Sequence, residues 1–242
     1  GSNVAIGNQS LEENTTGTRN VAVGRAVLES NTTGNYNVGV GYVVLNNSNG
    51  SYNTGIGYEA LKQNTTGDQN QAMGVNALTA NTTGNYNVAI GGNVLMAATT
   101  ADNNCGVGRN ALITCTTGNH NTAIGGAAAL FALTTGTYNT ACGTDALQST
   151  TTGNDNVALG ANAGSGITSG SENVCLGHDA GATQIGASSD RLYIARRDAA
   201  ASNTSVWIHG DQHGRCYMGG NVRSCLTRWV KDIKKVMVEK RP

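Results

Sequence analysis

The chain has 242 residues, with 34 glycines, one proline, one phenylalanine and only 12% charged residues. Low charge argues against disorder and scarce aromatic residues argue against a large globular core, so the composition is typical of a repeat or fibrous fold. The formal net charge is zero, but residues 1–189 carry 4 basic and 10 acidic residues, which argues against nucleic-acid binding by the body of the chain.

A five-residue pattern of the form Asn-Val-Ala-Ile-Gly, with close variants, begins at residue 3 and recurs along the chain. Successive copies begin 17 residues apart, except for one spacing of 16 and one of 18. Internal repetition of this regularity indicates a solenoid of stacked coils. The asparagines that open the eleven copies are Asn3, Asn20, Asn37, Asn53, Asn70, Asn87, Asn104, Asn121, Asn139, Asn156 and Asn173.

Each copy continues into an Ala-Leu pair and then an Asn-Thr-Thr-Gly turn. The first five residues alternate with a period of two, which predicts a strand. Their third position holds alanine, glycine or one cysteine, as a close backbone contact requires, and the fifth is glycine, which predicts a turn with positive φ. Two apolar columns result, one at the fourth position and one at the leucine. We expect two short strands per coil, with one apolar column on each.

These features predict an all-β fold, a parallel β-solenoid or β-roll of eleven coils, over residues 1–186. Coils stacked about 4.8 Å apart would make a rod roughly 50 Å long. Repeated asparagine and threonine can form hydrogen-bonded ladders along its axis. The NTTG stretches contain a glycosylation acceptor pattern, but they recur in step with the repeat, so we interpret them as turns.

Six cysteines are present without any CxxC spacing. Four of them occupy repeat positions that other coils fill with small or apolar residues, and we interpret these four as reduced thiols in the core. They are Cys105, Cys115, Cys142 and Cys175.

The segment IHGDQHGRC groups His209, Asp211, His213 and Cys216, but its spacing matches no zinc pattern. We therefore predict neither a metal nor a cofactor.

The repeat decays after Gly177. Residues 187–220 read as a β-rich transition, in which DRLYIA and VWIHGD predict two strands. Residues 221–242 place apolar side chains at helical spacing, which predicts an amphipathic helix that joins copies of the chain. We expect a homotrimer about the rod axis, intertwined or side by side. No window is apolar enough to predict a membrane span. The repeat begins at residue 3 without a capping segment, which suggests a fragment of a longer chain.

The stretches NVAIG, NTTG and NTAIG resemble the head repeats of trimeric autotransporter adhesins. They are more similar to repeats in phage tail fibres and in virion proteins of large algal viruses, and DRLYI with WIHGD resembles the segment that follows such repeats in tail fibres. The chain looks closest to the C-terminal part of chlorovirus virion proteins implicated in digesting the algal host wall. That resemblance implies a virion protein that acts outside the cell on wall polysaccharide during entry. It assigns no catalytic residue.

The residue before each repeat asparagine varies in a way that no packing rule dictates, so this column is expected to face solvent. In four successive coils it holds His120, Tyr138, Asp155 and Glu172. Asp155 and Glu172 would stack close to the 5–5.5 Å carboxylate separation of a retaining glycosidase. Alternatively, His120 and Tyr138 offer a base and an acid for β-elimination from a uronic acid, the lyase route. The four could also be unrelated surface residues.

Tyrosines on adjacent coils form a second candidate site. Tyr36 and Tyr52 are neighbours before the repeat asparagine, and Tyr42 and Tyr58 follow the turn glycine. An aromatic patch of this kind could hold sugar rings, or the tyrosines could form a ladder that stabilises the turns.

Three functions therefore stay open. The chain could be an enzyme, a lyase or glycoside hydrolase that degrades host cell-wall polysaccharide. It could be a non-catalytic fibre or adhesin module that binds wall glycans. It could also be a structural spacer of a larger virion protein. The sequence favours the first narrowly, without naming the sugar or the bond.

Overall fold

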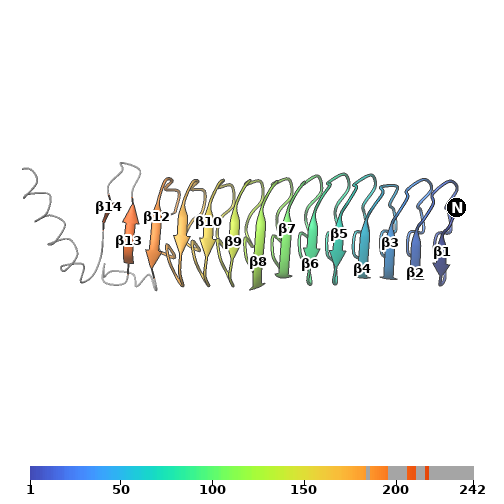
Figure 1. Cartoon of the computed structure of the whole chain (residues 1–242), viewed down its shortest axis with the longest axis horizontal. Coiled ribbons are helices and arrows are strands. Elements are labelled where there is room, and N and C mark those ends of the chain that lie inside the picture. Colours follow the sequence, from blue (N-terminus) through green and yellow to red (C-terminus); the bar gives the residue numbers. More distant parts are fainter. Residues whose placement is uncertain (184–185, 196–205, 211–215, 218–242) are drawn as a thin grey trace, which may run out of the picture.

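The computed structural model describes residues 1–183, 186–195, 206–210 and 216–217. Within them the chain forms one 14-stranded sheet whose strands follow one another in sequence order (Figure 1). Strands β1 to β12 pair in parallel, and β12, β13 and β14 pair antiparallel. The strands are β1 Val4–Ile6, β2 Val21–Arg25, β3 Val38–Tyr42, β4 Thr54–Tyr58, β5 Gln71–Met73, β6 Val88–Ile90, β7 Cys105–Arg109, β8 Thr122–Ala127, β9 Thr140–Cys142, β10 Val157–Leu159, β11 Val174–Leu176, β12 Leu192–Ala195, β13 Val206–Gly210 and β14 Cys216–Tyr217.

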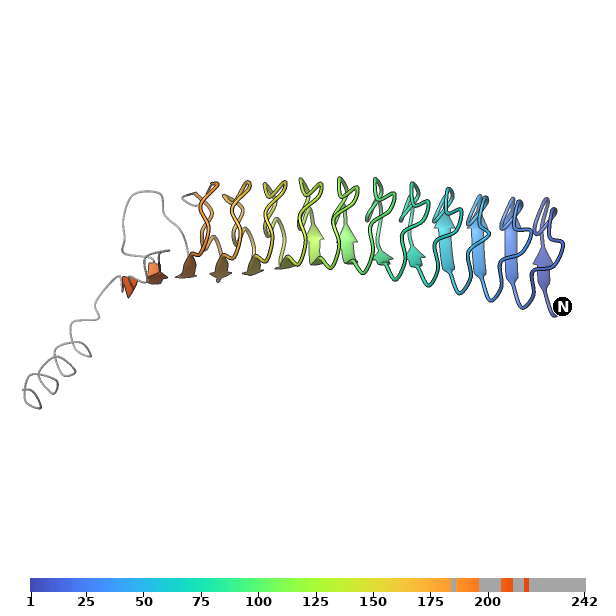
Figure 2. The ribbon, with the colours of Figure 1, turned by 90° about the horizontal axis from the view of Figure 1, so that it is seen from above.

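The predicted parallel β-solenoid is confirmed. Each coil is a narrow loop with its strand along one side (Figure 2). Corresponding repeat positions pair between neighbouring coils, as Val21 does with Val38. The 18-residue coil places its additional residue in β8, where the register shifts and Arg109 faces Ala127. One residue of length variation is thus absorbed without interrupting the stack.

Each coil contributes one strand rather than the two expected. The Ala-Leu segment instead forms a turn in which the leucine is left-handed, with φ of 52° at Leu28 and 49° at Leu45. This conformation is rare for a bulky residue. It is held by hydrogen bonds between coils, because the Leu28 N–H donates to Val44 O at 3.0 Å and the Leu45 N–H donates to Ala60 O at 3.0 Å. The segment therefore continues the inter-coil ladder without being extended.

Small side chains of the strand and the leucines of the turn together fill the interior. The third position of the five-residue pattern, which is alanine in most coils, is buried in β2 to β11. The leucines from Leu28 to Leu147 are buried as well. The residue before the leucine decides whether that third position holds alanine or glycine. Where this residue is valine, the next coil has glycine: Val27 with Gly39, Val44 with Gly55, and Val94 with Gly106. A Cβ on any of these glycines would lie 2.4–2.5 Å from a valine Cγ1.

The fourth-position column lies outside the core. Because side chains alternate across a strand, burial of the third position directs the second and fourth positions outward. Ile6 is 59% exposed, Met73 48% and Leu159 44%. Of the two apolar columns in the sequence, only the leucine column is therefore internal.

None of the four cysteines that occupy repeat positions forms a disulfide. Cys115 and Cys175 are buried in the core, as predicted, and burial raises the pKa of the Cys115 thiol to about 11. Cys105 is only half-buried and Cys142 is exposed. The prediction of a core position is wrong for both, because the second and fourth positions of the five-residue pattern face outward.

The strands predicted from DRLYIA and VWIHGD are present as β12 and β13. β12 extends the parallel sheet by one more strand, since Tyr193 pairs with Cys175, and β13 returns antiparallel to it. The expected helix over 221–242 lies outside the described residues. Within the described part of the chain, no helix is long and apolar enough to cross a membrane.

The valine–glycine pairing predicts a coupled substitution. Gly106→Ala should destabilise the fold by about 1–3 kcal/mol, because the added methyl meets the Val94 side chain. The double variant Gly106→Ala, Val94→Ala has the same two residues as the next coil, where Ala111 and Ala123 occupy the corresponding positions. Its loss of unfolding free energy should therefore be at least about 1 kcal/mol smaller than the sum of the losses of the two single variants. Urea unfolding of the four chains measures this. Additive effects would contradict it.

Two adjacent glycines provide a matched test of the turn. Gly91 has φ +130°, and a Cβ there would lie 2.8 Å from Gly108 O, whereas a Cβ on Gly92 would meet nothing within 4 Å. Gly91→Ala should cost about 3 kcal/mol through backbone strain and separation of the coils. Gly92→Ala should change stability by less than about 1 kcal/mol. Equal midpoints of thermal unfolding for the two variants would refute this explanation.

Candidate functional site

One exposed column of side chains runs along the solenoid beside a buried column of asparagines. We call it the edge column, and it consists of the residue before each repeat asparagine from Asn20 to Asn173. Every member is left-handed, with φ between 56° and 60°, and every member is exposed. The edge column is Arg19, Tyr36, Tyr52, Gln69, Tyr86, Asn103, His120, Tyr138, Asp155 and Glu172.

The buried asparagines fix the backbone of the edge column. Asn139 illustrates the contacts: its backbone N–H donates to Asn121 Oδ1 at 3.0 Å, and its Nδ2 donates to the same oxygen at 3.1 Å. The Nδ2 group also donates to Gly153 O at 2.8 Å, which closes the coil. Because the asparagines repeat the backbone bond and the coil-closing bond through the stack, successive members of the edge column present their side chains from equivalent backbone positions. The predicted asparagine ladder is confirmed.

His120 and Tyr138 lie against each other on adjacent coils. Their ring centroids are 4.7 Å apart and the rings are parallel to within 1°. Rings stacked in this way do not hydrogen-bond to each other in their planes, so the imidazole nitrogens and the phenol oxygen stay available to a third molecule. Tyr138 is 56% exposed. The pair can therefore offer two proton-transfer groups side by side to a substrate on the surface.

Asp155 and Glu172 follow in the next two coils. Both are exposed, and neither carboxylate has a hydrogen-bond or ion-pair partner among the described residues. Asp190 continues the column by one more coil, because Arg191 takes the place of the repeat asparagine and donates its backbone N–H to Asn173 Oδ1 at 3.0 Å. This third carboxylate was not predicted from the sequence. Aligning DRLYI with the repeat would have revealed it.

The four tyrosines form two stacked pairs, both capped by arginine. Tyr36 and Tyr52 stack at 4.8 Å between centroids and 6° between planes, and the Arg19 guanidinium lies 5.0 Å from the Tyr36 ring centroid. Arg19 Nη1 also donates to the Tyr36 hydroxyl. Arg19, and Arg25 in the second pair, were not predicted as site residues from the sequence. Each lies one coil before a tyrosine, in the same column of the repeat.

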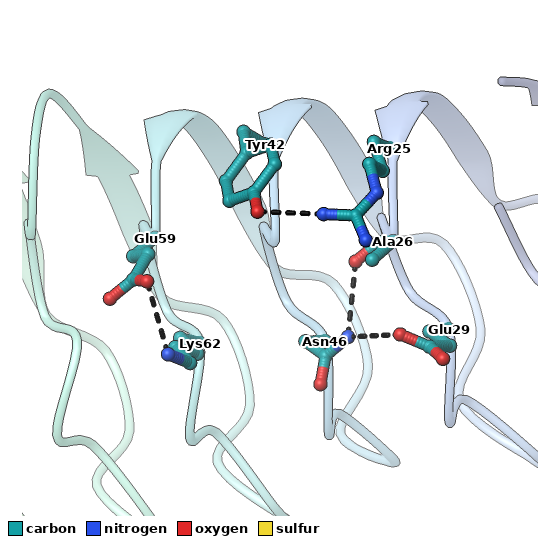
Figure 3. Close-up of polar contacts among 7 residues, drawn as sticks. All are labelled: Arg25, Ala26, Glu29, Tyr42, Asn46, Glu59 and Lys62. Carbon is teal, nitrogen blue, oxygen red and sulfur yellow. Dashed lines mark hydrogen bonds and ion pairs between the residues drawn. The ribbon is translucent and has the colours of Figure 1, made fainter. Parts of the chain in front are cut away.

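The second pair, Tyr42 and Tyr58, stacks at 5.3 Å and 6°. Arg25 donates to the Tyr42 hydroxyl at 2.7 Å and lies 5.4 Å from its ring (Figure 3). The pKa of Tyr58 is raised, mainly because the Glu59 carboxylate lies beside it. Glu59 in turn pairs with Lys62 at 3.1 Å (Figure 3).

The two tyrosine pairs lie at opposite ends of the strands and do not form one patch. Tyr36 precedes β3 and Tyr42 ends it, and a five-residue strand spans about 13 Å. In each pair, the tyrosines cover one face of each other's ring, and an arginine lies over the other face of the first. Three of the four ring faces in each pair are therefore in contact with another ring or a guanidinium, and a bound sugar would meet mainly ring edges and hydroxyls.

No group of three or more His, Cys, Asp or Glu side chains in the described part of the chain is arranged to hold a metal ion. Of the cluster noted in IHGDQHGRC, His209 lies in β13 and Cys216 in β14, while Asp211 and His213 lie outside the described residues.

Comparison of the chain with models of known protein families gave no match, and neither did comparisons with curated proteins and with solved structures.

Proposed function

We propose that the edge column binds a linear polysaccharide of a host cell wall, with the polymer lying along the rod. The observation that carries this is the column itself: exposed aromatic, amide and charged side chains at one per coil, on a backbone that repeats with the coil spacing. A polymer with a regular repeat can make contacts of the same kind with successive coils. Hydroxyl and amide groups bind sugar hydroxyls, and the aromatic rings add apolar contact.

The setting comes from the resemblance of the repeats to those of fibres and of chlorovirus virion proteins. On that basis the chain belongs to the outside of a virus particle and meets the wall during entry. The homotrimer about the rod axis is part of this proposal, because it would present three edge columns to the same wall and raise avidity.

Degradation of the bound polymer is the second candidate function, and the end of the edge column favours it. His120 and Tyr138 stand side by side, and Asp155 and Glu172 follow in consecutive coils. A carboxylate pair about one strand spacing apart suits a retaining glycosidase. Histidine and tyrosine suit β-elimination, in which the base takes the proton α to the uronate carboxylate and the acid protonates the leaving oxygen. The site is open, so the bound polymer itself would have to exclude water from the reacting groups.

The two tyrosine pairs allow a matched test of binding. Tyr36→Ala with Tyr52→Ala should weaken retention of the purified chain on wall polysaccharide at least tenfold, a loss typical of interface anchors. Tyr42→Ala with Tyr58→Ala removes an equivalent arginine-capped stack from the same two coils, but outside the edge column. This control should bind as the wild type does. Equal losses in both variants, or none in either, would contradict the placement of the polymer.

Turnover is tested separately by following new reducing ends and the ultraviolet absorbance of unsaturated uronate products. A hydrolase raises the first signal alone and a lyase raises both. Asp155→Asn with Glu172→Gln should abolish hydrolysis, and His120→Gln with Tyr138→Phe should abolish elimination, while both chains still bind polysaccharide. If the wild type retains polysaccharide and neither signal rises, the chain is a binding module. If it neither binds nor cleaves, it is a spacer.

A further inference from the structure

The solenoid exposes a mostly apolar face along its whole length. We call it the outward face, and it consists of the side chains at the second and fourth positions of the five-residue pattern in β1 to β11. Its polar members are all at the second position: Thr54, Gln71, Thr122 and Thr140. The fourth position is apolar or cysteine in every coil. Ile90 and Ile124 are each 42% exposed, and Cys142, next to Ile124 in register, is also exposed. A long row of apolar side chains open to water is uncommon on a protein that functions as a single copy.

Charged residues avoid this face and lie around it. In β1 to β11, no lysine, arginine, aspartate or glutamate occupies the second or fourth position of the five-residue pattern. The charges nearest in sequence lie at the ends of strands, as Arg25 and Arg109 do, or in the edge column, as Asp155 and Glu172 do. An apolar centre depleted of charge within a polar border is the composition of a protein interface.

The size of the face lies at or below the lower limit for a stable association. Eleven strands spaced about 4.8 Å apart extend about 48 Å, and strands of three and of five residues are about 7 Å and about 13 Å wide. The face therefore covers about 300–600 Å² per copy. Two such faces in contact bury up to about 1,200 Å², the lower limit of stable interfaces.

The regular spacing of the face indicates what covers it. Side chains that interdigitate along about 48 Å need a partner with the same period. A helix has a pitch of about 5.4 Å and would lose register by more than one coil over this length. A second copy of this chain has the same coil spacing because it has the same sequence. Its own outward face also exposes apolar side chains, which contact between the two faces would remove from water.

We infer that the outward face is where copies of this chain associate, sheet against sheet, along the length of the rod. This places the contact on the solenoid itself, and it does not depend on the segment over 221–242 or on the proposed polysaccharide. The edge column is a separate set of residues.

Sedimentation of the full chain provides the first test. The wild type should sediment as a dimer or trimer, and Ile90→Glu with Ile124→Glu should weaken association at least a hundredfold. Both isoleucines point away from the core, so the far-ultraviolet circular dichroism spectrum should not change. The control is Thr100→Glu with Thr135→Glu, which adds the same charges at exposed turn positions of the same two coils and should leave the assembly intact. A monomeric wild type, or a control that dissociates equally, would overturn the inference.

Alkylation of Cys142 gives a second readout, which stays informative if another segment also holds the copies together. Because Cys142 lies on the outward face, its thiol should react with a maleimide at least tenfold more slowly in the wild type than in the Ile90→Glu, Ile124→Glu chain. Mass spectrometry that localises the adduct separates Cys142 from the buried thiols of Cys115 and Cys175. Equal rates for Cys142 in the two chains would refute a covered face.

Discussion

The stacking of coils at one strand spacing is the constraint on which the rest of the structure depends, and the buried asparagines maintain it. Each asparagine closes its own coil through Nδ2 and accepts the backbone N–H of the next asparagine through Oδ1, as the bonds of Asn104 and Asn121 show. An unpaired amide at these positions would cost about 1–3 kcal/mol, so the column strongly favours one register. A second, shorter ladder ends where its partners change. The Oδ1 atoms of Asn31 and Asn81 are buried without a donor in the described part of the chain, because the next coils place Ser48 and Ala98 there.

This stacking also maintains backbone conformations that would be unfavourable in isolation. A typical coil holds left-handed residues at the turn after the strand, at the buried leucine and in the edge column. Conformations of this kind cost on the order of 1–3 kcal/mol each and persist only where the surroundings determine them fully. Here the surroundings are the neighbouring coils. Stability is therefore shared between coils and is not a property of any single repeat.

A backbone repeated this closely separates folding from function. Interior positions hold mainly alanine, glycine, valine, leucine and asparagine, whereas the edge column changes freely from arginine through tyrosine to glutamate. A side chain placed there enters a nearly constant geometry, so recognition and any chemistry can differ along one rod without a change in fold. The outward face obeys a third rule, because its fourth position stays apolar or cysteine in every coil although the interior of the coil does not require it.

The sequence by itself determined the period, the strand of each coil, the glycine turn and the exposure of the edge column, because these follow from spacing and residue type. Stacked pairs such as His120 with Tyr138 also followed, since one coil of separation places them one strand spacing apart. The tertiary structure alone decided which side of the strand faces inward. Alternation defines two faces without choosing between them, and the coil is too narrow to hold isoleucine opposite leucine, so the smaller alanine and glycine turn inward and the larger residues outward. It also decided that the four tyrosines stand in two pairs at opposite ends of the strands, because the path of the chain between Tyr36 and Tyr42 is a full strand.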